Sequence, residues 1–270
     1  MNAHISTDAA AFAQMLIQDA SFSEAASALW DGKSISAEGF AGGSSGLAIA
    51  ALFQHGNGSI VVVTSNADSA EQIADDILVF IEPEYRLKGG VLLFPPMEQR
   101  EYESESALAI ADESFGARLN VLKQLASYSE DRFVVVVSMP ALLQPVSPPE
   151  LLKERTQTLA VNSRVDLESL RQSLIEGGYH STSAVDLPGE FAVRGYILDL
   201  FAPDWEQPVR IEFVDDKIES IRRFDLTTQR SLERIAEIDL TRLQPHECVG
   251  ASLLDYFPKS TPIVLFDLVK

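Results

Sequence analysis

The sequence predicts an α/β protein that is built on a parallel sheet and continues into a smaller α+β unit. Three short apolar runs, at 59–64, 91–94 and 133–137, alternate with helix-like stretches. Continuous apolar runs between helices are typical of parallel strands that are covered on both faces. Beyond about residue 145 the pattern changes to one helix and several extended segments, which predicts the second unit.

Helices are expected after the first two strands. Asp68 and Glu71 indicate a helix start behind the first strand. Pro95 and Pro96 end the second strand, and a long amphipathic helix follows. The apolar side chains of the two helices are Ile73, Ile77, Leu78 and Phe80 in the first, and Leu108, Phe115, Leu119 and Leu122 in the second.

The second unit is expected to begin after a proline-rich linker at 145–149. A helix is predicted from about 166 to 175, because two glycines at 177–178 then end it. The residues 214–217, Val-Asp-Asp-Lys, predict a hairpin turn. The extended segments of this unit are expected at 191–201, 209–213 and 218–224.

The charge balance argues against a dedicated nucleic-acid-binding domain. The chain has 40 acidic and 21 basic residues and a net charge of −19, whereas binding to phosphates favours a basic excess. Twelve of the 21 basic residues lie within 149–243, so a polar partner surface is expected there. Cys248 is the sole cysteine and the four histidines have no ligand spacing, so no disulfide and no metal site are expected. The sequence shows no signal peptide and no membrane span, which favours the cytoplasm.

A glycine-rich loop, 39–46, is similar to a phosphate-binding loop but lacks its chemical groups. With Gly39 as the first glycine, Ser44 stands in place of the second glycine, Ser45 in place of the lysine and Gly46 in place of the Ser/Thr. The lysine would reach the phosphates and the hydroxyl would hold Mg²⁺. We therefore expect no catalytic residue here, no bound cofactor and a loop that serves as a turn before a helix near Leu47.

The last apolar run, 262–270, predicts another buried parallel strand. Asp267 stands where a Walker B strand carries its metal-binding carboxylate, but Leu268 follows where a Glu is usual. Together with the loop, this suggests a RecA-like domain that has kept its shape and lost its chemistry. A chain that stops directly after a core strand is expected to be a piece of a longer protein.

One segment resembles a signature shared by UvrB and the transcription-repair coupling factors, and a second resembles a segment of the coupling factors. The more specific resemblance starts with 189–201, Gly-Glu-Phe-Ala-Val-Arg-Gly-Tyr-Ile-Leu-Asp-Leu-Phe, and continues through 208–213 and 216–231. The other covers 94–98, Phe-Pro-Pro-Met-Glu, and runs on through Tyr102 to Leu119. The degenerate loop and the short interval after Phe94, which leaves no room for the DNA-clamping hairpin of UvrB, favour the coupling factors.

The resemblance implies an incomplete RecA-like, P-loop NTPase-like parallel-sheet domain with an inserted small α+β domain. The RecA-like part would cover 1–148, the inserted domain 149–243, and 244–270 would begin a returning RecA-like segment. In the family, the inserted domain recruits the damage-recognition ATPase UvrA. RNA polymerase and DNA are expected partners only through C-terminal domains that these 270 residues do not contain.

The family's UvrA contacts correspond to Arg194, Arg210 and Val214 here, although the family has an aromatic residue at the position of Val214. Arginine forks pair bidentately with carboxylates, so they suit an acidic partner. The alternative for each arginine is a surface ion pair with Glu190, Asp199 or Glu212. The alternatives for the chain are a UvrB-like, ATP-dependent DNA-binding repair subunit and a direct DNA-binding domain.

Overall fold

The computed structural model describes residues 3–97, 110–127 and 132–267, which form two compact units. The first unit comprises 1–96, 128–144 and 257–270, and the second comprises 97–127 and 145–256. These units have other bounds than the predicted domains, because the helix at 113–127 groups with the second unit. The predicted division at 148 and 243 stays a prediction about family domains.

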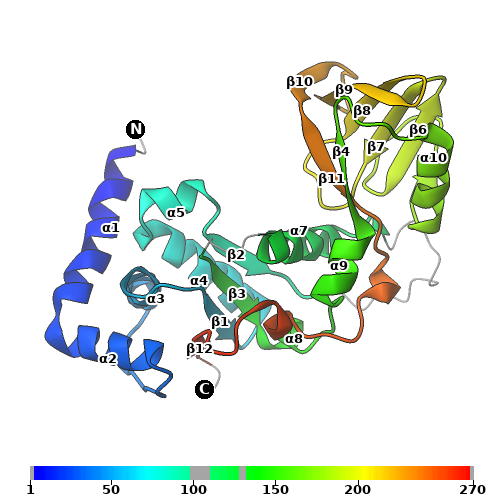
Figure 1. Cartoon of the computed structure of the whole chain (residues 1–270). Helices are drawn as coiled ribbons and strands as arrows, with labels where there is room; N and C mark the ends of the chain where they lie inside the picture. Colours follow the sequence, from blue (N-terminus) through cyan, green and yellow to red (C-terminus); the bar gives the residue numbers. More distant parts are fainter. Residues whose placement is uncertain (1–2, 98–109, 128–131, 268–270) are drawn as a thin grey trace. The chain divides into compact units, whose positions relative to one another are not determined.

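The first unit contains a four-stranded parallel sheet, as expected from the apolar runs (Figure 1). The strand order is β12-β1-β3-β2. Every residue of β1 and β3 is buried, which explains why these strands are apolar throughout. The strands are β1 (Ile60–Thr64), β2 (Val91–Phe94), β3 (Val134–Ser138) and β12 (Ile263–Phe266).

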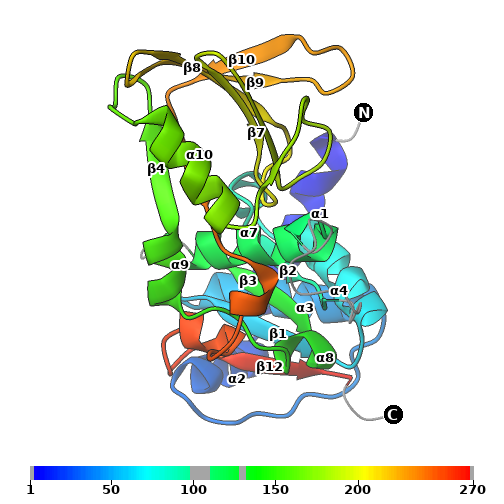
Figure 2. The same cartoon turned by 90° about the vertical axis from the view of Figure 1, so that its right-hand side faces the viewer.

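Helices of the first unit pack on one another and on this sheet (Figure 2). Helix α4 (Ala67–Phe80) contacts β1, β2 and β3, and its cap is Asn66, so Asp68 lies in its first turn and Glu71 further along it. The core joins α3 and α4 to the strands through residues such as Phe53, Ile77 and Val136. The remaining helices are α1 (Ala3–Gln18), α2 (Ala20–Trp30), α3 (Gly43–His55), α5 (Pro83–Leu87) and α8 (Met139–Leu142).

Strand β12 corrects one expectation, since it is not a buried strand. It pairs in parallel with β1, as predicted, but it lies at the edge of the sheet. Ile263 and Leu265 are exposed, while Val264 and Phe266 pack against the core. An apolar run therefore identified the strand but not its place in the sheet. Asp267 directly follows it with φ 48°, and Leu268 lies outside the described residues.

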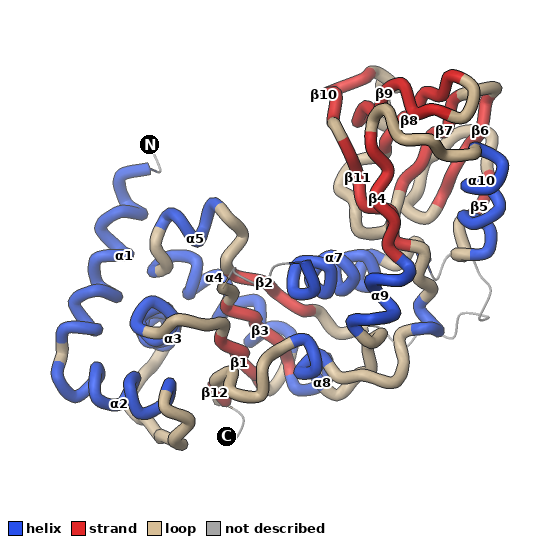
Figure 3. The backbone as a smooth tube through the Cα atoms, in the orientation of Figure 1, coloured by secondary structure: helices blue, strands red, loops and turns tan. Residues whose placement is uncertain are grey.

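The second unit contains a six-stranded sheet in the order β10-β9-β8-β7-β6-β5, in which only the β5–β6 pair is parallel (Figure 3). The expected extended segment 191–201 is in fact two strands, because Gly195 and Tyr196 form a two-residue turn between them. Gly195 has φ 61°, a conformation that glycine adopts without strain. The strands are β5 (His180–Ser181), β6 (Glu190–Arg194), β7 (Ile197–Phe201), β8 (Val209–Val214), β9 (Lys217–Phe224) and β10 (Ser231–Ile235).

A second, two-stranded sheet and several helices complete this unit. The hairpin turn between β8 and β9 is confirmed, with Asp215 at φ 54°. Helix α10 runs from Leu167 to Glu176, close to the predicted 166–175, and its caps are Asp166 and Gly177. Helix α7 carries Gly116, where a Cβ would lie 2.1 Å from the carbonyl oxygen of Pro203. The other elements are α7 (Glu113–Ser127), α9 (Pro149–Arg155), β4 (Thr156–Ala160), β11 (Glu237–Thr241) and the 3-10 helices η1 (Pro245–Glu247) and η2 (Leu253–Tyr256).

Together these observations confirm the predicted fold class. A parallel sheet with helices is accompanied by antiparallel sheets in a second unit, which is compatible with an incomplete RecA-like domain and an inserted small domain. The predicted helix around Phe115 and Leu119 is also present, whereas Leu108 and Tyr102 lie outside the described residues.

Candidate protein-interaction site

The glycine-rich loop makes hydrogen bonds among its own residues. Residues 33–41 form no regular secondary structure, and α3 begins at Gly43 rather than near Leu47. The Ser44 amide donates to the carbonyl of Ala41, the Ser45 amide donates to Gly42, and the Ser44 hydroxyl both donates to and accepts from Ala41. Amide donors that a phosphate-binding loop turns toward its ligand are therefore used within the loop itself.

Gly46 has a packing role in this structure. A Cβ at this position would lie 2.6 Å from the Cβ and 2.7 Å from the carbonyl carbon of Asp76, so only glycine lets α3 approach α4 this closely. The carboxylate of Asp76 also comes near the first turn of α3, 3.9 Å from where a Gly43 Cβ would be. A negative charge there disfavours an anion at the helix N-terminus. Within the described residues, the buried hydroxyl of Ser45 has no hydrogen-bond partner.

The second unit presents a row of charged side chains on one face of its large sheet. Strand pairing places Asp199, Arg210 and Arg222 in one cross-strand rung and Arg194, Ile197, Glu212 and Ser220 in the next. Side chains two residues apart on a strand share a face, so the two rungs lie next to each other. We call Arg194, Asp199, Arg210, Glu212 and Arg222 the arginine face.

Asp199 lies at the centre of this face. Its Oδ1 accepts a hydrogen bond of 2.6 Å from Arg210 Nε, and its Oδ2 accepts one of 2.8 Å from Arg210 Nη2. The same Oδ2 accepts a third bond, of 3.3 Å, from Arg194 Nη2. The carboxylate is 3% exposed, and a bidentate pair fixes a guanidinium in direction as well as in distance. Asp199 therefore brings together the two arginines that the sequence singled out.

Arg194 and Arg210 differ in exposure and in the number of hydrogen bonds that they donate to Asp199. The side chain of Arg194 is 56% exposed and donates a single hydrogen bond to Asp199. The side chain of Arg210 is 22% exposed, binds Asp199 through two nitrogens and lies 4.9 Å above the ring of the buried Phe224. Hydrogen bonding to Asp199 raises the pKa of Arg210 above its usual value. Arg210 is thus tied to the sheet, whereas Arg194 faces solvent.

A second ion pair continues the row. Arg222 Nη2 donates to Glu212 Oε2 at 3.0 Å, and the Ser220 hydroxyl donates to the same oxygen at 2.6 Å. Sequence reasoning did not place Arg222 opposite Arg210, where the strand pairing has it. The two-residue turn at 215–216 does not reveal this pairing, because a bulge between Glu212 and Phe213 shifts the register by one residue and places Arg210 opposite Arg222.

Exposed apolar side chains lie at one end of the arginine face. Val214 ends β8, and the Phe213 amide beside it donates to the Tyr196 carbonyl at 2.9 Å. Tyr196, Ile197 and Val214 are all exposed, and Ile197 pairs with Arg194 across the β6–β7 hairpin. A charged group next to apolar side chains is a common composition for a protein-binding surface. Val214 therefore lies at the end of the arginine face, near the exposed Tyr196.

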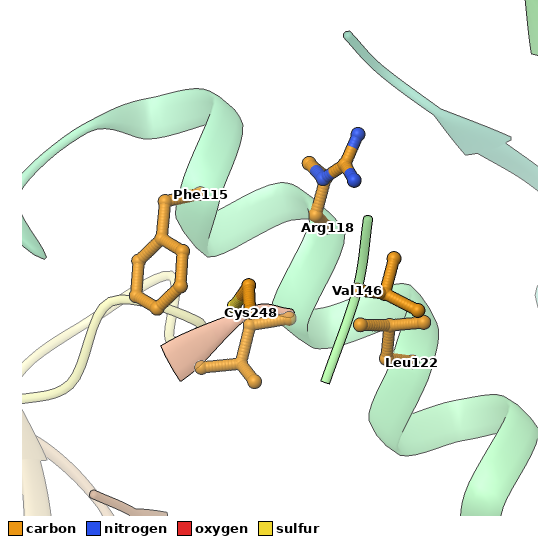
Figure 4. A pocket seen from close by; sticks show the side chains of 6 residues that line it. Phe115, Arg118, Leu122, Val146 and Cys248 are labelled. Carbon is orange, nitrogen blue, oxygen red and sulfur yellow. The ribbon is translucent and has the colours of Figure 1, made fainter. Parts of the chain in front are cut away.

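Two other polar clusters of this unit are buried and serve packing. Lys123 of α7 pairs with Asp204 at 2.5 Å, and burial raises the pKa of Asp204 while Lys123 opposes the shift. A cavity of about 10 Å³, room for one water, is lined by Phe115, Arg118 and Cys248 (Figure 4). Burial lowers the pKa of Arg118 to about 10 and raises the pKa of Cys248 to about 11, so the thiol stays protonated at neutral pH.

Neither a metal cluster nor a membrane-spanning helix is found within the described ranges. These residues contain no group of three His, Cys, Asp or Glu side chains that could hold a metal ion. None of the helices described is long and apolar enough to cross a bilayer.

Comparison with known proteins links this unit to a repair family. The model of a family described as the UvrB interaction domain matches residues 158–244, which contain the whole arginine face. A transcription-repair-coupling factor of Staphylococcus aureus (strain MSSA476) is 32% identical over 193 residues, 72% of this chain and 16% of the relative. Those of Bacillus subtilis (strain 168) and Myxococcus xanthus are 31% and 32% identical over 75% and 81% of this chain, and 16% and 18% of the relatives.

The chain thus spans about a sixth of the length of the relatives it matches. Both the match over most of its residues and the domain model agree with the resemblance carried by 189–231. The chain belongs to the transcription-repair-coupling factor family, and its residues 158–244 match the model of the UvrB interaction domain.

Proposed function

We propose that this chain is the module by which a transcription-repair coupling factor recruits UvrA during transcription-coupled nucleotide excision repair. The observation that carries the proposal is the pair Arg194 and Arg210, held side by side by one buried carboxylate on the exposed face of the interaction domain. Oriented guanidinium groups suit the carboxylates of an acidic partner.

We also propose that these 270 residues have no catalytic activity and bind no cofactor. The glycine loop has no lysine, and the amides of Ser44 and Ser45 donate to carbonyl oxygens within the loop. In a full-length coupling factor, we assign the contacts with RNA polymerase and DNA to the part of the relatives that this chain does not match. The net charge of −19 supports a protein partner rather than DNA for these residues.

The test is binding of the 270-residue chain to purified UvrA by titration calorimetry. The double variant Arg194→Ala plus Arg210→Ala is expected to weaken binding at least about 30-fold, because desolvated interface arginines are worth about 2 kcal/mol or more. Its matched control is Arg171→Ala plus Arg223→Ala, which removes two arginines of the same unit that also form ion pairs. Arg223 lies opposite Val209, on the other face of the sheet.

The control is expected to bind UvrA within about threefold of the wild type, because exposed ion pairs contribute little. Circular dichroism should show that both variants fold. If the unmodified chain does not bind UvrA, or if the control loses as much affinity as the double variant, the proposed function is wrong.

A further inference from the structure

Arg194 and Arg210 are chemically alike but are held in different ways, and this difference separates their roles. Arg210 uses Nε and Nη2 on Asp199, stacks on Phe224 and is 22% exposed. Arg194 keeps most of its donors free of the contacts that the structure shows and is 56% exposed. A partner that approaches this face meets the guanidinium of Arg194 first.

We propose that Arg194 makes the contact with the partner's carboxylate, and that Arg210 is a positioning residue that acts through Asp199. This inference rests on the proposed function and assigns roles within the same site. Arg210 neutralises the Asp199 carboxylate and occupies both of its oxygens, which leaves Asp199 only one longer bond, of 3.3 Å, to Arg194. The guanidinium of Arg194 is thereby oriented, and its other hydrogen-bond donors face solvent.

The role of Arg210 follows from what Asp199 would do without it. The carboxylate is almost fully buried, and a buried charge without a counterion takes the nearest cation available. That cation is Arg194, which already touches Oδ2. In an Arg210→Met variant, Asp199 would draw Arg194 onto the sheet and neutralise it, so the partner would lose its contact although Arg194 is intact.

This reading predicts a rescue. Adding Asp199→Asn to Arg210→Met removes the unpaired charge, while the amide oxygen that replaces the carboxylate still accepts a hydrogen bond from Arg194. The double variant loses one charge of each sign, so its net charge equals that of the wild type and long-range attraction is unchanged. If Arg210 instead touches the partner directly, removing Asp199 as well cannot restore the lost contact.

The experiment measures the Kd for purified UvrA of the wild type, of four variants and of one control variant. We expect Arg210→Met to weaken binding about tenfold and the double variant Asp199→Asn plus Arg210→Met to return to within about threefold of the wild type. Arg194→Ala should weaken binding at least about 30-fold, and adding Asp199→Asn to it should restore nothing. The matched control is Glu233→Gln plus Arg223→Met, the same charge-neutral exchange in an exposed pair of the same sheet, which should bind as the wild type does.

The outcomes separate the two claims. If the wild type does not bind UvrA, the proposed function falls. If the wild type binds and the double variant stays as weak as Arg210→Met, the positioning role of Arg210 is wrong while the proposed function stands. If Arg210→Met proves unfolded by circular dichroism, Arg→Lys changes decide instead. Arg194→Lys must then cost more affinity than Arg210→Lys, because only a contact residue needs the planar fork toward the partner; equal or reversed losses overturn the inference.

Discussion

The glycine loop of the first unit and the arginine face of the second both gather polar groups, but they use them in opposite ways. In the loop, the Ser44 and Ser45 amides bind carbonyls of the loop, and Asp76 places a negative charge near the helix start. On the arginine face, Arg194 keeps free donors at the surface while Asp199 fixes its direction. Resemblance to a ligand-binding motif is therefore less informative than the number of polar groups that the local structure leaves available.

Besides exposed pairs such as Arg171–Glu168, the second unit has charged pairs with a buried carboxylate. The Lys88–Glu84 pair of the first unit is exposed, whereas the second unit buries Asp204 against Lys123 and Asp199 against Arg210. Exposed pairs contribute at most about 1 kcal/mol, but a buried carboxylate that loses its cation is costly. Charges in the second unit are thus part of its architecture as well as of its surface.

The largest expected effect tests this difference in charged pairs. Lys123→Met should lower the free energy of unfolding by about 3–5 kcal/mol, because it leaves the buried carboxylate of Asp204 without its cation. Lys88→Met, the matched change in the exposed pair, should cost less than about 1 kcal/mol. Urea unfolding of both variants measures the difference. Equal losses would show that burial of the charge does not distinguish the two units.

A smaller effect is expected in the glycine loop. Gly46→Ala should destabilise the chain by about 1–3 kcal/mol, because its Cβ would overlap the backbone of Asp76. Gly43→Ala, one turn earlier, meets no atom closer than 3.9 Å and should change stability by less than about 0.5 kcal/mol. Urea unfolding of the two variants checks this. A harmless Gly46→Ala would mean that the glycine is not needed for packing α3 on α4.

The smallest expected effect is that of Mg-ATP on the thermal midpoint of unfolding. Millimolar Mg-ATP should leave the thermal midpoint unchanged to within about 1 °C, because a ligand stabilises a protein only when it binds the folded state. Inorganic sulfate at the same concentration controls for ionic strength. A clear upward shift with Mg-ATP, but not with sulfate, would contradict the inert loop and favour the UvrB-like ATPase alternative. Turnover of ATP would then be the next measurement.

Much of the architecture was predictable because side-chain patterns are local. Apolar runs predicted β1, β2 and β3, and the glycines at 177–178 predicted the end of α10. The site was predictable only in part. The sequence singled out Arg194 and Arg210 through a family resemblance, and it offered Asp199 only as one of three possible ion-pair partners. It gave no reason to expect both arginines on the same carboxylate.

The sequence by itself determined the strands β1, β2 and β3, the helices α4, α7 and α10 and the hairpin turn between β8 and β9, and that the glycine loop has no lysine to offer a phosphate. The tertiary structure alone decided that β12 lies at an edge, that Gly46 serves packing, and that Asp199 bridges Arg194 and Arg210. The reason is physical. Periodicity along one segment fixes which face a side chain takes, whereas strand order, register and close approach depend on the segments with which it pairs.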